Sequence, residues 1–157
     1  MNDKKKYMEA AIKLASENLD LNQGGPFGAI IVKDGEIVGR GVNKVTATND
    51  PTAHAEVIAI RDATKTLNTF NLEGCEIYTS CEPCPMCLGA IYWARINMLY
   101  YAGTKDDAAK ADFDDSAIYK EFCLPKEKRF IPSSQMMREE AVKVFEEWIK
   151  SDHKIPY

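Results

Sequence analysis

The sequence lacks an apolar run long enough to cross a membrane. No uninterrupted stretch of its 157 residues reaches the roughly 18 apolar residues that a spanning helix requires. A short basic run at Lys4 to Lys6 lies near the start, but no apolar segment follows it as in a secretory signal peptide. We therefore expect a cytoplasmic protein that does not act at a membrane.

An excess of positive charge is also missing. The chain carries 20 basic and 24 acidic residues, for a formal net charge of −4. Proteins that bind nucleic acid use a basic surface to attract the phosphate backbone. The charge balance therefore argues against a polyanionic partner, and we expect no nucleic acid to be bound.

The cysteines do not form the even set that a small secreted disulfide framework would need. There are five of them, and Cys81, Cys84 and Cys87 crowd into one short segment. This spacing favours metal ligation in a reducing compartment over disulfide formation.

Hydrophobic periodicity predicts a single α/β domain over residues 1–157, since no repeat, low-complexity segment or linker divides the chain. Asp34-Gly35 is suited to a tight hairpin turn between two strands. A strand, helix and strand between residues 75 and 102 imply a parallel pair. The predicted helices cover residues 4–19, 53–67, 83–93 and the region of Ala141 to Trp148, and the predicted strands cover 27–32, 36–41, 75–80 and 96–102. Helices should cover both faces of a mixed sheet.

Two short motifs carry the chemistry: HAE at residues 54–56 and PCPMC at residues 83–87. Together they read H-x-E followed by P-C-x-x-C, the signature of zinc-dependent deaminases that act on bases. Cys84 and Cys87 are three residues apart in the first turn of a predicted helix, so both sulfurs lie on one face. The free N–H groups at a helix start also favour the thiolate forms that bind metal.

His54, Cys84 and Cys87 would give one zinc ion three protein ligands and leave a fourth position for water. Zinc lowers the pKa of bound water to about 7, so a zinc-bound hydroxide is the expected nucleophile. Glu56 is close enough to take the proton of this water and pass it to the ring nitrogen and the departing amine. We therefore predict that Glu56 is the catalytic proton shuttle.

A structural zinc site is the alternative to a catalytic one. Cys81, three residues before Cys84, would then close the shell as a fourth ligand. Against this, Cys81 is predicted in a turn, away from the helix face that Cys84 and Cys87 share. A purely structural zinc module would also leave Glu56 without a role.

Four segments, GGPFGAIIVKDG, NDPTAHAE, TSCEPCPMCLGAIYWAR and FDDSAIYKE, resemble those of bacterial guanine deaminases of the cytidine deaminase-like fold. The resemblance runs from about residue 5 to 122 and returns at the C-terminal tyrosine. It implies a three-layer α/β/α sandwich with a central mixed five-stranded sheet. It also implies hydrolysis of guanine to xanthine and ammonia, with one zinc ion per subunit.

The resemblance further implies how the base is held. Phe27 would stack on the ring, Asn43 would hydrogen-bond to the base, and the backbone N–H of Ala55 would help to hold it. Trp93 matches a position near the pocket, although an indole at a helix end also suits a hydrophobic core. Phe27 could likewise begin a buried strand.

Asp115 matches an acidic position that contacts the substrate in this family. A carboxylate can accept hydrogen bonds from both the N1–H and the amino group of guanine. Asp114 could take this role instead, and Asp115 also suits the N-cap of a helix through Tyr119.

Tyr157 resembles a C-terminal tyrosine that closes over the active site. Members of this family are dimers, so the resemblance implies a homodimer. In this group the C-terminal helix and tail, about residues 137–157, can be exchanged between subunits.

Other functions share parts of the same pattern. A tRNA-adenosine deaminase has the same two motifs but needs a basic surface for the phosphates. A cytosine deaminase needs a small pyrimidine pocket, and a non-catalytic zinc module would bind a partner instead. The acidic balance, the acidic pair at residues 114 and 115 and the terminal tyrosine favour guanine over tRNA.

Overall fold

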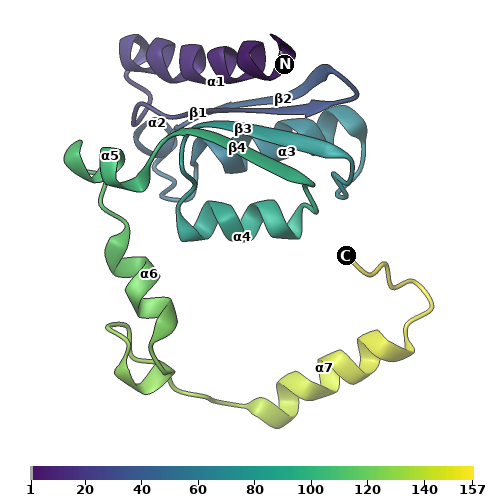
Figure 1. The fold of residues 1–157 in the computed structure, drawn as a ribbon. Helices are drawn as coiled ribbons and strands as arrows, with labels where there is room; N and C mark the ends of the chain where they lie inside the picture. The colour runs from purple at the N-terminus through teal and green to yellow at the C-terminus, as the bar shows by residue number, and fades with distance from the viewer. Residues whose placement is uncertain (1) are drawn as a thin grey trace. The chain divides into compact units, whose positions relative to one another are not determined.

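A four-stranded mixed sheet organises the first of two units in the computed structural model, which describes residues 2–157 (Figure 1). The first unit extends to Ser116, and the second comprises Ala117–Tyr157. In chain order the elements of the first unit are α1 (Asn2–Leu21), β1 (Gly28–Lys33), β2 (Glu36–Val42), α2 (Val45–Thr48), α3 (Ala55–Leu67), β3 (Cys75–Cys81), α4 (Pro85–Trp93), β4 (Met98–Gly103) and α5 (Lys105–Lys110). Helix α6 (Ser116–Cys123) begins at the end of this unit.

The strands lie in the order β2-β1-β3-β4. Strand β1 is antiparallel to both β2 and β3, and β3 is parallel to β4, which confirms the predicted strand, helix and strand arrangement. The predicted hairpin is also present. Asp34 and Gly35 both have positive φ, at 50° and 84°, as a tight two-residue turn between β1 and β2 requires.

The expected five-stranded sheet is wrong, because the sheet formed by residues 2–157 has four strands. After β4 the described chain continues as α5, α6, a short 3₁₀ helix and a last α-helix, with no further strand. Ala141, Val144, Phe145 and Trp148 accordingly lie on helix α7 (Arg138–Lys150). The mixed orientation and the α/β layering of the prediction are confirmed.

Helices cover both faces of the sheet, as Figure 1 shows for α1 on one side and α3 and α4 on the other. Successive side chains of β1 point to opposite faces. Ile30 and Val32 pack with Tyr7 and other residues of α1, whereas Ala29 and Ile31 pack in the core beneath α3 and α4. This central strand is therefore buried from both sides, and it fixes the positions of the helices that carry the site.

The second unit contains the rest of α6, a short 3₁₀ helix (Lys126–Lys128) and α7. None of the residues of α6 or α7 is buried. Apolar side chains of α7 are therefore exposed, with exposed fractions of 66% for Phe145 and 65% for Ile149. Across residues 2–157, no helix has both the length and the apolar character needed to span a bilayer.

Helix α3 lies against β2 so closely that only glycine fits at two positions of the strand. A Cβ atom at Gly41 would lie 2.0 Å from the carbonyl oxygen of Ala55 and 2.5 Å from the backbone nitrogen of Ala59. Gly39 meets the next turn of the helix in the same way. This contact holds the first turn of α3, where the predicted site begins.

We expect Gly41→Ala to lower the free energy of unfolding by about 3 kcal/mol, because the new methyl group would push α3 away from the sheet. Urea unfolding followed by circular dichroism measures this change. Gly89→Ala is the matched control, because a Cβ at Gly89 of α4 meets no atom within 4 Å. An equal loss of stability in both variants would contradict this account.

Candidate functional site

One edge of the sheet gathers the segments that carry the predicted site residues. Because β1 is antiparallel to its neighbours, its first residue lies beside the last residues of β2 and β3. The Gly28 N–H donates to Ser80 Oγ at 3.0 Å, and Cys81 pairs with Gly103 at the ends of β3 and β4. Phe27 before β1, Asn43 after β2 and Cys84 after β3 are therefore all carried at this edge.

His54 and Cys84 each occupy the N-cap position of a helix. The expected helix starts at residues 53 and 83 are each too early, since α3 begins at Ala55 and α4 begins at Pro85. Both cap residues are extended, with φ/ψ of −74°/155° for His54 and −65°/167° for Cys84. Pro85 suits the first position of a helix because that residue needs no N–H.

The side chains of His54, Cys84 and Cys87 form a group able to hold a metal ion. Their ligand atoms lie within 4.8 Å of one another. His54 Nδ1 is 3.5 Å from the Sγ atoms of both Cys84 and Cys87. A tetrahedral zinc ion with Zn–S of about 2.3 Å and Zn–N of about 2.0 Å would separate its nitrogen and sulfur ligands by about 3.5 Å. The three residues therefore fit zinc.

The electrostatics of the three side chains also suit a cation. The pKa of Cys84 is lowered to about 4. The main cause is a hydrogen bond from the Cys87 thiol, and a hydrogen bond from His54 lowers it further. The same hydrogen bond to Cys84, together with burial, raises the pKa of Cys87. Cys84 raises the pKa of His54. A metal ion that binds here would replace these shared protons, as thiolate and imidazole ligands require.

Glu56 lies in the first turn of α3 and is 8% exposed. Burial raises the pKa of its carboxyl group, and the charge of Cys84 raises it further. A buried carboxyl group with a raised pKa is suited to accept and return a proton, as general acid–base catalysis requires. This placement agrees with the role that the sequence predicts, next to the metal ligands but outside their group.

Cys81 is the last residue of β3 and is not part of the metal-ligating group. Its Sγ contacts the carbonyl oxygen of Thr104 at 3.5 Å. Burial raises the pKa of Cys81 to about 11, with further contributions from Glu56 and, more weakly, Asp115. The Cys81 sulfur lies outside the group of ligand atoms and is directed to a backbone carbonyl, which disfavours the structural zinc alternative.

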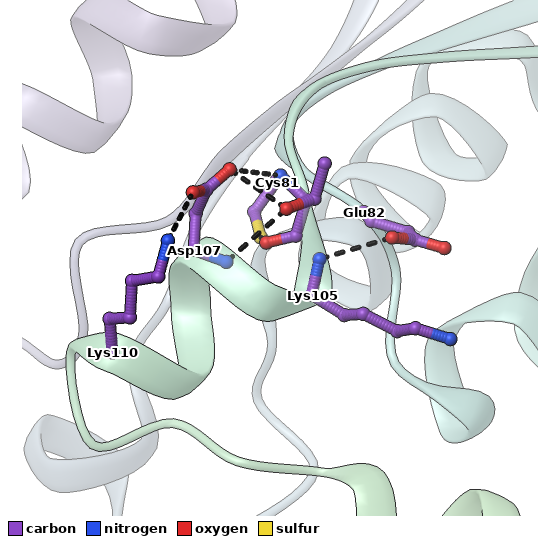
Figure 2. A network of polar contacts seen from close by, with 6 residues as sticks. Cys81, Glu82, Lys105, Asp107 and Lys110 are labelled. Carbon is purple, nitrogen blue, oxygen red and sulfur yellow. Dashed lines mark hydrogen bonds and ion pairs between the residues drawn. The ribbon is translucent and has the colours of Figure 1, made fainter.

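Helix α5 is tied to the end of β3 by the polar contacts in Figure 2. The Lys105 N–H donates to Glu82 Oε2 at 3.0 Å, and the Glu82 N–H donates to the Gly103 carbonyl at 2.8 Å. Thr104 and Asp107 form a reciprocal capping box at the start of the helix. The exposed Lys110–Asp107 ion pair at 3.7 Å adds little to stability.

The segment after α5 returns to the site through an aromatic contact. Phe113 packs edge-on against Phe27 with ring centroids 4.9 Å apart. Burial and the charge of Cys84 raise the pKa of Asp115, so this carboxyl group lies within electrostatic reach of the metal ligands. Asp114 is exposed, and its Oδ1 accepts the Ser116 N–H at 2.9 Å. Asp114 thus supports the start of α6, whereas Asp115 is less exposed.

Asn43 is 6% exposed and has a fixed side-chain orientation. Its Oδ1 accepts the N–H groups of Gly25 at 3.2 Å and Val45 at 3.1 Å. Because the oxygen is used in this way, the Nδ2 group is the part of the amide left to donate to a ligand. The half-buried ring of Phe27 stands two residues beyond Gly25.

The remaining predicted contacts lie in different places. Ala55 is buried as the first residue of α3, where backbone N–H groups have no partner within the helix. Trp93 is 67% exposed at the C-terminal end of α4, so it is not a core residue, and it lies at the opposite end of that helix from Cys84. Tyr157 belongs to the second unit.

The sequence matches the cytidine and deoxycytidylate deaminase zinc-binding region over residues 1–103. The chain belongs to this family. It is 53% identical over 151 residues to a guanine deaminase of Bacillus subtilis (strain 168), covering 96% of this chain and 97% of that protein. The X-ray structure of guanine deaminase from Bacillus subtilis superimposes with a TM-score of 0.94 at 52% identity, covering 98% of each chain. A tRNA-specific adenosine deaminase of Aquifex aeolicus is 42% identical over 99 residues, covering 63% of this chain and 65% of that protein.

The chain is thus a homologue of guanine deaminase with a zinc-binding deaminase domain. Both motifs, HAE and PCPMC, lie inside the matched region. No motif in the sequence indicates the contact of Phe113 with Phe27 or the hydrogen bond from Lys105 to Glu82. Only the capping box had a sequence signal, since Thr104 and Asp107 show the spacing of a Ser/Thr residue followed three positions later by an acid.

We expect Cys84→Ser to abolish tight zinc binding and Cys81→Ser to retain one zinc ion per chain. The reason is that Cys84, unlike Cys81, belongs with His54 and Cys87 to the group whose ligand atoms lie within 4.8 Å of one another. Zinc content after exhaustive dialysis, measured by plasma emission spectrometry, decides the matter. Loss of zinc from the Cys81 variant would instead support the structural site in which Cys81 is the fourth zinc ligand.

Proposed function

We propose that this deaminase hydrolyses guanine to xanthine and ammonia with one zinc ion per subunit. The observation that carries the proposal is one arrangement of side chains. Beside the His/Cys/Cys group lie a buried carboxyl group, Glu56, and a second carboxyl group, Asp115, within electrostatic reach of Cys84. The homology to guanine deaminase of Bacillus subtilis supports the choice of base.

His54, Cys84 and Cys87 would hold the zinc ion. When bound, zinc supplies a water molecule acidic enough to lose a proton near neutral pH. Glu56 is the group placed to accept that proton, because it lies in the same helical turn that follows His54 and is shielded from solvent. It would then deliver protons to the ring nitrogen and to the departing amine, so that ammonia leaves neutral.

The polar groups around the site match the edge of guanine. Asp115 offers acceptor oxygens to the N1–H and the amino group, while Asn43 Nδ2 offers a donor to an acceptor atom of the base. Adenine and cytosine carry an unprotonated ring nitrogen beside their amino group, which would face the carboxylate oxygens without a bridging proton. The ring of Phe27 and the backbone N–H of Ala55 would complete the contacts.

We also propose a homodimer in which the C-terminal segment, about residues 137–157, covers a partner. Its support is the exposed apolar face of α7, including Val144, Phe145 and Trp148, in a unit too small to bury that face by itself. In that arrangement Tyr157 would close the partner's site. Trp93 would serve a second copy rather than its own chain, because it lies at the far end of α4.

The proposed partners are therefore the base and a second copy of the chain, with no nucleic acid and no membrane. A cytoplasmic location is part of the same proposal. Metal binding needs Cys84 and Cys87 as free thiols, and both are free in the structure.

We expect zinc-loaded protein to release ammonia from guanine, and Glu56→Gln to lose at least about 1,000-fold in kcat while keeping its zinc, because the amide cannot carry protons. An enzyme-coupled ammonia assay compares guanine, cytosine, adenine and a tRNA anticodon stem-loop. Activity on the stem-loop alone would reassign the chain to tRNA editing. Full activity in Glu56→Gln would contradict the mechanism.

Asp115→Asn should lower kcat/KM for guanine by roughly tenfold to a hundredfold, because one of the two acceptor oxygens facing the base becomes a donor. Asp114→Asn is the matched control and should have little effect, since Asp114 serves the start of α6. Steady-state kinetics on guanine measure both variants. If the larger loss occurs in Asp114→Asn, the two residues have been assigned the wrong way round.

A further inference from the structure

Asn18 is a fully buried polar side chain that the proposed mechanism does not use. It lies on α1, on the face that packs against the sheet, and its exposed fraction is 0%. Other buried residues on this face of the helix, such as Ala11 and Ala15, are apolar. An amide is costly to bury unless it is hydrogen-bonded, so its partners show what it does.

Both hydrogen bonds of the Asn18 amide go to segments that carry predicted substrate contacts. Its Nδ2 donates to the carbonyl oxygens of Gly25 and Asn43, each at 2.9 Å. Gly25 belongs to the turn that presents Phe27, and Asn43 follows β2. One side chain from α1 therefore joins the segment before β1 to the segment after β2, at the open end of the β1–β2 hairpin.

The connection closes into a ring. The Gly25 N–H donates back to Asn43 Oδ1 at 3.2 Å. The turn packs closely on the Asn43 side chain, because a Cβ atom at Gly24 would lie 2.2 Å from the same Oδ1. A second donor, the Val45 N–H, holds that oxygen from the other side at 3.1 Å. The backbone of Asn43 is thus fixed by Asn18, and its side chain is fixed by its neighbours.

We propose that Asn18 is a positioning residue for base binding: through the Gly25 and Asn43 carbonyls it holds Phe27 and Asn43 in the places from which they contact the substrate. This inference rests on the proposed function. Loss of the Asn18 amide removes the side-chain donor that the two carbonyl oxygens share, and so weakens the link between the turn and the end of β2. The Gly25 carbonyl oxygen keeps the Phe27 N–H at 2.8 Å and the Asn43 N–H keeps the Phe27 carbonyl oxygen at 3.2 Å, so the two segments stay connected but are less tightly held. The metal ligands and Glu56 lie on other segments and keep their places.

Helix α1 provides a control for an effect on folding alone. Near its other end, Tyr7 Oη donates to the carbonyl oxygen of Gly35 at 2.5 Å, in the hairpin turn. Tyr7 and Asn18 thus make the same kind of bond, from a side chain of one helix to the backbone of one hairpin. Only the Asn18 bonds reach segments at the site edge of the sheet.

The test compares Asn18→Ala with Tyr7→Phe in zinc-loaded protein. We expect Asn18→Ala to raise KM for guanine by at least about tenfold, the size expected for the loss of a buried hydrogen-bond donor. Its kcat should stay within about threefold of wild type, with full zinc content. Tyr7→Phe should leave KM unchanged even if both variants melt at lower temperature. Equal KM values in the two variants would overturn the proposal.

Amide hydrogen exchange followed by NMR gives a readout that needs no activity. In the wild type, the Gly25 and Val45 amides should be protected like the amide of Ile31 in β1, and Asn18→Ala should speed their exchange while Tyr7→Phe does not. Exchange of these two amides at loop rates in the wild type would refute the proposal even if Asn18→Ala failed to fold. Wild-type inactivity on guanine would refute the proposed function instead, and the exchange comparison would still decide the role of Asn18.

Discussion

The meeting of two helix N-termini at one edge of the sheet is the constraint on which the site depends. Residue 54 caps α3 and residue 84 caps α4, and the start of α3 is held against β2 where glycine allows the closest approach. The three donor atoms come within 4.8 Å of one another only because the sheet fixes both helices. Free N–H groups at these helix starts also favour the anionic thiolates, so fold and metal chemistry require the same arrangement.

Two sets of residues near the metal ligands have different proposed roles, one in proton transfer and one in binding the base. The carboxyl group of Glu56 lies beside the ligands and is shielded from water, which suits proton transfer. Under the proposed function, Phe27, Asn43 and Asp115 would contact the base from separate segments. Phe27 packs against Phe113, and Asn43 accepts hydrogen bonds from Gly25 and Val45. Selectivity for the base would then depend on contacts that involve no metal ligand.

The sequence was sufficient for features that depend on nearby residues. The Asp34-Gly35 turn, the parallel pair and the three ligands follow from short motifs and from spacing along the chain. The fifth strand was expected from family resemblance alone, and the described residues after β4 form helices and irregular segments instead. Contacts between distant residues, such as Asn18 with Asn43 or Phe113 with Phe27, left no pattern to find, because they depend on how the finished strands align. The exposure of Trp93 likewise could not be read from its place at a helix end.

The most direct test of the account is the coordination of zinc itself, measured by X-ray absorption at the zinc K-edge of the loaded protein. The account predicts two sulfur ligands at about 2.3 Å and two lighter ligands at about 2.0 Å, one from His54 and one from water. Three sulfur ligands and one nitrogen would mean that Cys81 closes the shell. That result would contradict a catalytic site with an open position and leave a structural zinc module in its place.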